Sequence, residues 1–483
     1  MQRKFVTNLA LVLGLNLLIK PFWVLGIEVG VQNAVGTEQY GFYYAIFNFT
    51  FLLNIILDFG ITSFNNKNIA QNNHLLSKHF SSIVVLRLLL AGIFSIITLL
   101  GGLLIGYTPD MMKMLVAVMC NQILISFIMY LRSNLAGLHL FKTDSIVSVL
   151  DRLIMIVICG FLLLTHREKG SFDIRWFIYG QVAAYFITAL ITLVIVIDKA
   201  RLKRFTWRYP FFMMILKKSY PYALLGLLMS FYYRIDGVML ERILPFRTGA
   251  YQAGIYASAY RLLDAANMIA VLFSGLLLPI FARMIKLKHN VEEMVKLSFS
   301  LLVIPAMMVA ICSYFFSNNL MHLLYHGSNA DESAAVFRIL MCCFVPISST
   351  YIFGTLLTAN GNLKLLNILA SSGMATNIIL NFILIPRLGA VGAAISSIST
   401  QLFIAVTQVF LVQKLFSFRQ NVRLIMTIIF FLLSAILICK YVQLLPVHWV
   451  SRMIIAVIGC TALAFASRLI SVRNLFRIVR EEE

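Results

Sequence analysis

YGFYYAIFNFTFLLN, residues 40–54, has a counterpart 213 residues further along the chain, AGIYASAYRLLDAAN at 253–267. Three residue types recur in register at this offset: Gly at 41 and 254, Tyr at 43 and 256, and Asn at 54 and 267. Both stretches are apolar and open long apolar segments. The match therefore predicts a fold made of two related halves.

Two further matches follow the same order along the chain. AGLHLFK (136–142) resembles ANGNLK (359–364), and Lys20 aligns with Arg234 after one residue of slippage. Together the matches predict two six-helix halves. Because six is even, both halves enter a membrane in the same orientation, so the axis relating them is a pseudo-two-fold along the membrane normal. A substrate site is then expected between the halves, near the middle of the membrane.

The composition places the chain in the membrane class. Hydrophobic residues make up 60% of the 483 and charged residues 12%, with a mean hydropathy of +0.89. Soluble proteins are about half apolar and a quarter charged. The net charge of +21 would suggest nucleic acid in a soluble protein. In a membrane protein it reflects Lys and Arg in cytoplasmic loops, so no nucleic acid is expected as a partner.

Apolar segments long enough to cross a bilayer, about 20 residues each, recur along the whole chain. We expect an all-α polytopic membrane protein with about 14 transmembrane helices. The first apolar segment continues without a small-residue cleavage site, so it is expected to be an uncleaved span. The predicted spans are 5–31, 40–61, 82–106, 111–132, 145–165, 175–198, 219–243, 252–282, 295–316, 336–358, 365–386, 390–413, 422–441 and 449–470.

The spans and the basic residues predict the domain organisation and the orientation. Residues 1–198 form an N-terminal six-helix lobe and 219–413 a C-terminal one, joined by the basic segment 199–218, which is expected to lie in the cytoplasmic membrane interface. Residues 414–483 add two transmembrane helices and a cytoplasmic tail. The distribution of Lys and Arg places both termini in the cytoplasm.

Charged residues inside the spans are the candidate functional residues. Each costs a few kcal/mol in a bilayer, so such side chains usually face a bundle interior or an aqueous cavity. Arg234 and Asp236 stand two apart and point about 200° from each other on a helix, so they serve different surfaces. The cations are Lys20, Arg87, Arg152, Arg234 and Arg261, and the carboxylates are Glu28, Asp58, Asp151, Asp236 and Asp264.

The cations suggest the charge of a substrate. Lys20 and Arg234 stand at equivalent places in the two halves, and two cations directed at one cavity suit an anion. The carboxylates have two interpretations: they form ion pairs that tie helices together, or they bind a coupling ion. The seven cysteines all lie in apolar runs and are interpreted as small core hydrophobes, so no metal site is expected.

Three stretches resemble a known family. They are 35–61, 253–284 and 356–401, and the most specific piece is TNIILNFILIPRLGAVGAAISS at 376–397. The sequence resembles the polysaccharide flippases, which belong with the multidrug exporters and the lipid II flippase in one superfamily. Six residues of the last piece recur as in relatives: Asn377, Asn381, Pro386, Gly389, Gly392 and Ala393.

The resemblance implies a flippase of the bacterial inner membrane. Its expected substrate is an undecaprenyl-diphosphate-linked oligosaccharide, such as an O-antigen unit for lipopolysaccharide, moved to the periplasmic leaflet by alternating access. Lys20, Arg234 and Arg261 match places where relatives carry cations, whereas the coupling role of carboxylates such as Asp58 and Asp264 does not transfer residue by residue. The expected partners are membrane lipids, a polysaccharide polymerase and its chain-length machinery.

Two alternatives remain beside the flippase. An ion-coupled multidrug exporter of the same superfamily would favour acidic residues in its cavity. A membrane enzyme of polysaccharide assembly, a polymerase or ligase, would carry a large reactive periplasmic loop, and the longest here is 317–337. In that loop His322 and His326 have a zinc-binding spacing but no third ligand nearby. No catalytic residue and no cofactor are expected, and coupling to a proton gradient, a sodium gradient or neither stays open.

Overall fold

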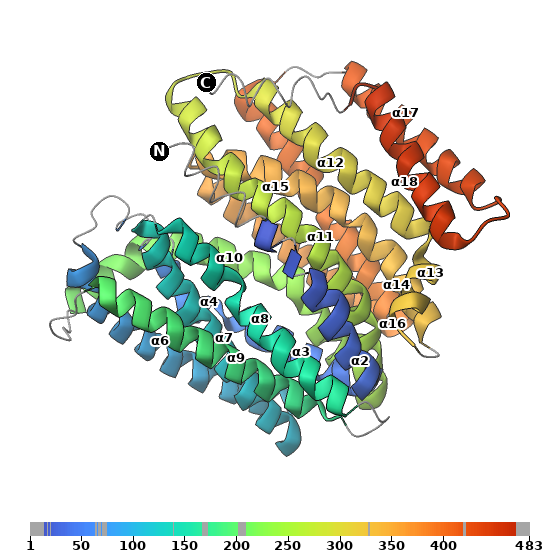
Figure 1. Ribbon diagram of the computed structural model, residues 1–483. Helices are drawn as coiled ribbons and strands as arrows, with labels where there is room; N and C mark the ends of the chain where they lie inside the picture. Colours follow the sequence, from blue (N-terminus) through green and yellow to red (C-terminus); the bar gives the residue numbers. More distant parts are fainter. Residues whose placement is uncertain are drawn as a thin grey trace. The chain divides into compact units, whose positions relative to one another are not determined.

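The computed structural model describes a helical membrane protein (Figure 1). Within the described residues the regular structure is helical throughout, without strands. Packing divides the chain into two compact units, Met1–Gly254 and Ile255–Glu483. The described residues are 14–16, 18–19, 21–62, 65, 69, 75–138, 140–166, 172–200, 209–326, 329–418 and 422–469.

The first unit is built around α3, α7 and α9. Helix α7 packs against both α3 and α9, α8 packs against α9, and α10 packs along α3. The elements are η1 (Trp23–Glu28), α2 (Val29–Val35), α3 (Thr37–Leu53), α4 (Ile55–Asp58), α6 (Leu75–Ile105), α7 (Pro109–Gly137), α8 (Phe141–Thr165), α9 (Ile174–Ala200), α10 (Tyr209–Ile243) and the start of α11 (Phe246–Lys286).

The second unit is built around α12, which packs against α14, α15, α17 and α18. Helix α16 packs against α14 and α15. The elements after α11 are α12 (Glu292–Phe315), α13 (Ser317–Leu324), α14 (Ala330–Cys342), α15 (Phe344–Ala359), α16 (Leu363–Phe416), α17 (Val422–Val442) and α18 (Trp449–Ala466).

The described residues contain twelve helical segments long and apolar enough to cross a membrane. One of them, α16, has 54 residues and bends at Gly389, so it holds the two predicted spans 365–386 and 390–413. The first predicted span, 5–31, lies partly outside the described residues. The prediction of an all-α polytopic membrane protein with about fourteen spans is confirmed.

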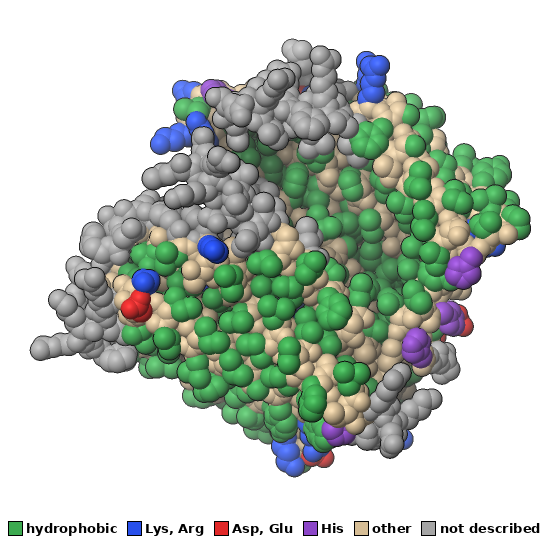
Figure 2. All heavy atoms as spheres, viewed as in Figure 1, with side chains coloured by type: hydrophobic (Ala, Val, Ile, Leu, Met, Phe, Trp, Pro, Cys, Tyr) green, Lys and Arg blue, Asp and Glu red, His purple; other side chains and the backbone are tan. Residues whose placement is uncertain are grey.

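The surface of the helices fits a lipid environment. On α6, Leu88, Ile96 and Leu104 are 61–88% exposed, whereas Arg87 on the same helix is 5% exposed. Apolar side chains cover most of the described surface in the view of Figure 2, and charged ones lie mainly at its edges. Water would penalise so much exposed apolar area, whereas lipid tails do not. The chain is therefore a multi-pass membrane protein.

The bend in α16 explains why the most specific stretch of the sequence has its composition. Gly389 has φ +56° and ψ −132°, a conformation that favours glycine. A Cβ on Gly392 would overlap the carbonyl oxygen of Leu384. Across the bend the Ser396 hydroxyl donates to the backbone carbonyl of Asn377 at 3.1 Å. Before the bend, one turn along the same segment, the Asn381 amide donates to Asn377 Oδ1 at 3.1 Å. These residues close a tight hairpin of two spans.

The domain boundaries predicted from the sequence stay predictions. Helices α17 and α18 pack on α12, which suits two helices appended to a lobe. Of the basic segment 199–218, residues 209–218 form the first turns of α10, and 201–208 lie outside the described residues.

Candidate functional site

Arg87 of α6 makes hydrogen bonds and an ion pair to three neighbouring residues. Its Nη2 pairs with Asp58 and donates to the Thr62 hydroxyl at 2.7 Å. Its Nη1 donates to the backbone carbonyl and the hydroxyl of Ser126 at 2.8 and 3.0 Å. The guanidinium also lies 4.9 Å from the ring centre of Tyr130. Arg87 therefore ties α4, α6 and α7 together, as an ion pair between helices would.

Arg152 of α8 lies in a different setting, among aromatic rings. Its guanidinium carbon is 5.5 Å from the ring centre of Trp23 and 5.9 Å from that of Tyr185. Its Nη1 donates to the Tyr185 hydroxyl at 3.2 Å, and its Nε lies 3.7 Å from Asp151 Oδ2. Glu28 is close enough to interact with it electrostatically. The fold thus brings one candidate cation and two candidate carboxylates into one cluster, the Arg152 cluster (Arg152, Asp151, Glu28, Trp23 and Tyr185).

The backbone beside this cluster is unusual. Residues Trp23–Glu28 form one turn of π-helix, which presents Trp23 and Glu28 from the first span. Trp23 stacks on Phe177 of α9 with ring centres 5.9 Å apart and planes 10° apart, and Glu28 is 6% exposed. Single π-turns inside helices often occur at functional sites. The Arg152 cluster therefore combines charge, aromatic surface and irregular helix in one place.

Arg234 and Asp236 of α10 face different surroundings, as helical geometry requires. The Arg234 guanidinium lies 5.1 Å from the ring centre of Phe51 on α3, and its side chain is half-buried. Asp236 is 1% exposed. Next to it, a Cβ on Gly237 would lie 2.5 Å from Asn48 Nδ2, so α10 and α3 approach closely here. This close packing fixes α10, which carries Arg234, against α3, which carries Phe51.

The two charges that end α10 fasten helices. Glu241 Oε2 lies 2.6 Å from Arg242 Nε, and the Glu241 side chain is fully buried. Arg242 Nη1 donates to the backbone carbonyl of Ile105 at 3.1 Å, and its guanidinium lies 4.5 Å from the ring centre of Tyr107. Burial raises the pKa of the Tyr107 phenol, and the nearby Glu241 carboxylate raises it further. This group links the end of α10 to the end of α6.

The remaining candidates lie elsewhere. Arg261 (9% exposed) and Asp264 (half-buried) lie on α11 within the second unit. Lys20 lies outside the described residues. In the loop 317–337, His322 Nε2 is 2.8 Å from Asp331 Oδ1, so its described partner is a carboxylate.

Sequence reasoning missed the groups that surround the cations. Arg87 and Arg152 stand out in a hydropathy pattern, but their partners do not. Serine and threonine are common in membrane helices, so Ser126 and Thr62 do not stand out. Aromatic residues make up 13% of the chain, so nothing in the sequence distinguishes Trp23 or Tyr185 from the others. Their roles depend on the rotation of each helix against its neighbours.

Comparison with solved structures shows which proteins have a similar fold. The lipid II flippase MurJ in an inward closed conformation matches with a TM-score of 0.74 at 15% identity, over 95% of this chain and 99% of that one. An inward-facing multidrug resistance MATE family transporter of the MOP superfamily matches with a TM-score of 0.62 at 15% identity, over 83% and 98%. The fold is that of the MOP superfamily transporters.

A third structure of this fold comes from Pyrococcus furiosus, a MOP superfamily transporter whose binding pocket is described as having reverse polarity. It matches with a TM-score of 0.55 at 15% identity, over 85% of this chain and 94% of that one. No curated protein matches the sequence. The model of the polysaccharide biosynthesis protein family matches residues 8–285, more than half of the chain. The chain belongs to the polysaccharide biosynthesis protein family.

Proposed function

We propose that this protein is a flippase that moves an undecaprenyl-diphosphate-linked oligosaccharide, an O-antigen or other surface polysaccharide unit, from the cytoplasmic to the periplasmic leaflet of a bacterial inner membrane. One observation carries the proposal: a chain of the polysaccharide biosynthesis family shares its fold with a lipid II flippase over nearly its whole length. That protein is described as a flippase of lipid II, which supports a lipid-linked substrate for this chain as well. Alternating access of two lobes would move it, and no enzymatic step is needed.

The diphosphate is the part of this substrate that the cations would recognise. Each charge-assisted hydrogen bond to an arginine contributes about 1.5–3 kcal/mol. Arg234 and Arg152 are the main candidates, because their guanidinium groups lie against aromatic rings of neighbouring helices. Arg152 also interacts with Asp151 and Glu28, so a diphosphate would compete with these carboxylates for its charge. Lys20 and Arg261 complete the proposed set. Arg87 is a weaker candidate, because Asp58, Thr62 and Ser126 occupy its donors.

Ion coupling would depend on the buried carboxylates. Glu28 and Asp151 lie in the Arg152 cluster, where a bound proton or sodium ion would change the charge presented to a diphosphate. Asp264 and Asp236 are the candidates on α11 and α10. Asp58 is the least suitable, because it is held by Arg87. Both termini are proposed to be cytoplasmic, and a polymerase with its chain-length machinery is proposed to take over the product.

A multidrug exporter is the second candidate, because the MATE family transporter shares the fold. Deletion of the gene separates the two. A flippase mutant accumulates the lipid-linked oligosaccharide in the cytoplasmic leaflet, where an added membrane-impermeant glycosidase cannot reach it in intact spheroplasts. If the oligosaccharide stays accessible from outside and the cells instead become sensitive to cationic drugs, the exporter is correct and the flippase is not.

A further inference from the structure

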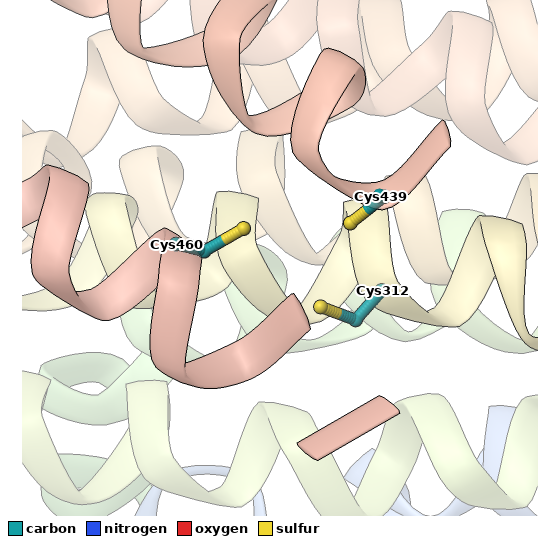
Figure 3. Close-up of side chains that lie close together, drawn as sticks. All are labelled: Cys312, Cys439 and Cys460. Carbon is teal, nitrogen blue, oxygen red and sulfur yellow. The ribbon is translucent and has the colours of Figure 1, made fainter. Parts of the chain in front are cut away.

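Three cysteines from three helices converge in the second unit. Cys312 lies near the end of α12, Cys439 near the end of α17, and Cys460 within α18. All three are buried, and their sulfur atoms lie within 4.8 Å of one another. In Figure 3 the three Sγ atoms point toward a common centre. Among the described residues, these form the one group of three or more His, Cys, Asp or Glu side chains close enough to share an ion.

Core packing explains why these cysteines are buried, but not why they meet. A free cysteine behaves as a small hydrophobe, so Ala, Val or another small residue would fill each position equally well. The neighbours show this, since Ala435 and Ala456 are fully buried in the same core cluster as Ile311. Cys312 and Cys439 are 127 residues apart in the sequence, and Cys439 and Cys460 are 21 residues apart. Their sulfur atoms nevertheless lie close together. Convergence of this kind is what a ligand set requires.

The surroundings supply more sulfur and a place for an ion to enter. Met308 and Met453 pack against the cluster. Both thioethers, together with Cys312, line a cavity of about 240 Å³ beside it. Thiolate and thioether ligands select soft metal ions, above all Cu(I). The other side chains that line the cavity are apolar apart from Ser313, so sulfur atoms are its main soft ligands and could pass a soft ion from methionine to cysteine.

We propose that Cys312, Cys439 and Cys460 form a binding site for one soft monovalent metal ion, Cu(I). Structural zinc sites almost always use four ligands, and the described group offers three. Charge favours a monovalent ion as well. Cu(I) would displace one thiol proton, which is released to water, and form a Cu–S bond to the resulting thiolate. This Cu(I)–thiolate pair is neutral, as an apolar core favours, and the other two sulfur atoms lie beside the ion. The bound ion would tie α17 and α18 to α12.

The test uses the purified full-length chain, reduced and kept without oxygen in detergent. Cu(I) is titrated against a chromogenic Cu(I) chelator. We expect about one tightly bound Cu(I) per chain, with sulfur as the only atom directly bonded to it in X-ray absorption spectra. Bound Cu(I) should also raise the thermal unfolding temperature, because it joins three helices. Zn(II) should compete poorly.

The native cysteines supply a matched control. Cys120, Cys159, Cys342 and Cys343 lie outside the group. Replacing these four by Ser should leave Cu(I) binding intact, whereas Cys312→Ser, Cys439→Ser and Cys460→Ser together should abolish it. Cys→Ala at the same three positions gives a second variant if the serines prevent folding. Equal binding by the chain without the three cysteines, no binding by the wild type, or tighter binding of Zn(II) than of Cu(I) would each overturn the proposal. None of these outcomes depends on flippase activity.

Discussion

Gly41 and Gly254 pack against each other's helices in a reciprocal way. A Cβ on Gly41 of α3 would overlap the carbonyl oxygen of Ala250 on α11, and a Cβ on Gly254 of α11 would overlap the carbonyl oxygen of Thr37 on α3. Thr37 and Ala250 are themselves separated by the 213 residues that separate the two glycines. Helices α3 and α11 therefore cross at equivalent positions of the repeated sequence, and the two contacts are related as by a local two-fold axis. Small residues four apart on each helix allow the backbones this contact.

This crossing predicts that Gly41→Ala and Gly254→Ala destabilise the protein. Each added methyl would force the helices apart, and overpacking of this kind costs about 1–3 kcal/mol. Thermal unfolding in detergent measures the effect. Gly275→Ala on the same α11 is the control, because a Cβ there meets nothing within 4 Å. Equal unfolding temperatures for all three variants would mean that the crossing is looser than described.

The repeat shows what could be predicted from the sequence. The apolar spans were enough to predict an all-α membrane protein, because they depend on local composition, and the recurrence of Gly41 and Gly254 pointed to two positions of close helix packing. The turn at Gly389 could also be recognised. The pairing of Arg87 with Asp58 and the meeting of the three cysteines could not, since they depend on how each helix is rotated and on neighbours far apart in the sequence.

The Arg87–Asp58 pair is expected to be a structural link. Asp58→Asn should destabilise the protein by about 3–5 kcal/mol, because the buried Arg87 loses its partner. Arg87→Ala should also destabilise the protein, but by less, because the remaining Asp58 side chain is 30% exposed. Thermal unfolding and the yield of folded protein are the measurements. Lys113→Ala is the control, since its pair with Asp110 is 70% exposed on both sides and should contribute less than about 1 kcal/mol. If Arg87→Ala has normal stability but no transport, Arg87 binds the substrate and is not a structural link.

The Arg152 cluster allows a structural role and a substrate role to be separated. Arg152→Ala alone should reduce both stability and transport, because it leaves Asp151 and Glu28 without their cation. The double variant Arg152→Ala/Asp151→Ala should recover much of the stability, since one of the two uncompensated charges is gone. Transport should stay low in the double variant if Arg152 binds the diphosphate. Recovery of transport together with stability would show that the cluster only holds helices together.

Orientation is tested by labelling single introduced cysteines with an impermeant maleimide. Lys217→Cys and Lys286→Cys should react only after the membrane is opened, because both positions are expected on the cytoplasmic side. Asp110→Cys and Asn318→Cys, which are exposed near helix ends, should react in intact spheroplasts. If Lys217→Cys were labelled in intact spheroplasts, the proposed orientation of the chain in the membrane would be wrong.

The most direct test of the proposed function measures translocation of an undecaprenyl-diphosphate-linked oligosaccharide in proteoliposomes that contain Arg234 variants. Arg234→Ala should slow translocation by about 10- to 150-fold, the value of one lost charge-assisted hydrogen bond. Arg234→Lys should retain part of the rate, because the charge remains and the bidentate fork is lost. Arg175→Ala, which removes an exposed arginine, should leave the rate unchanged. Wild-type translocation by folded Arg234→Ala would contradict recognition of the diphosphate by Arg234.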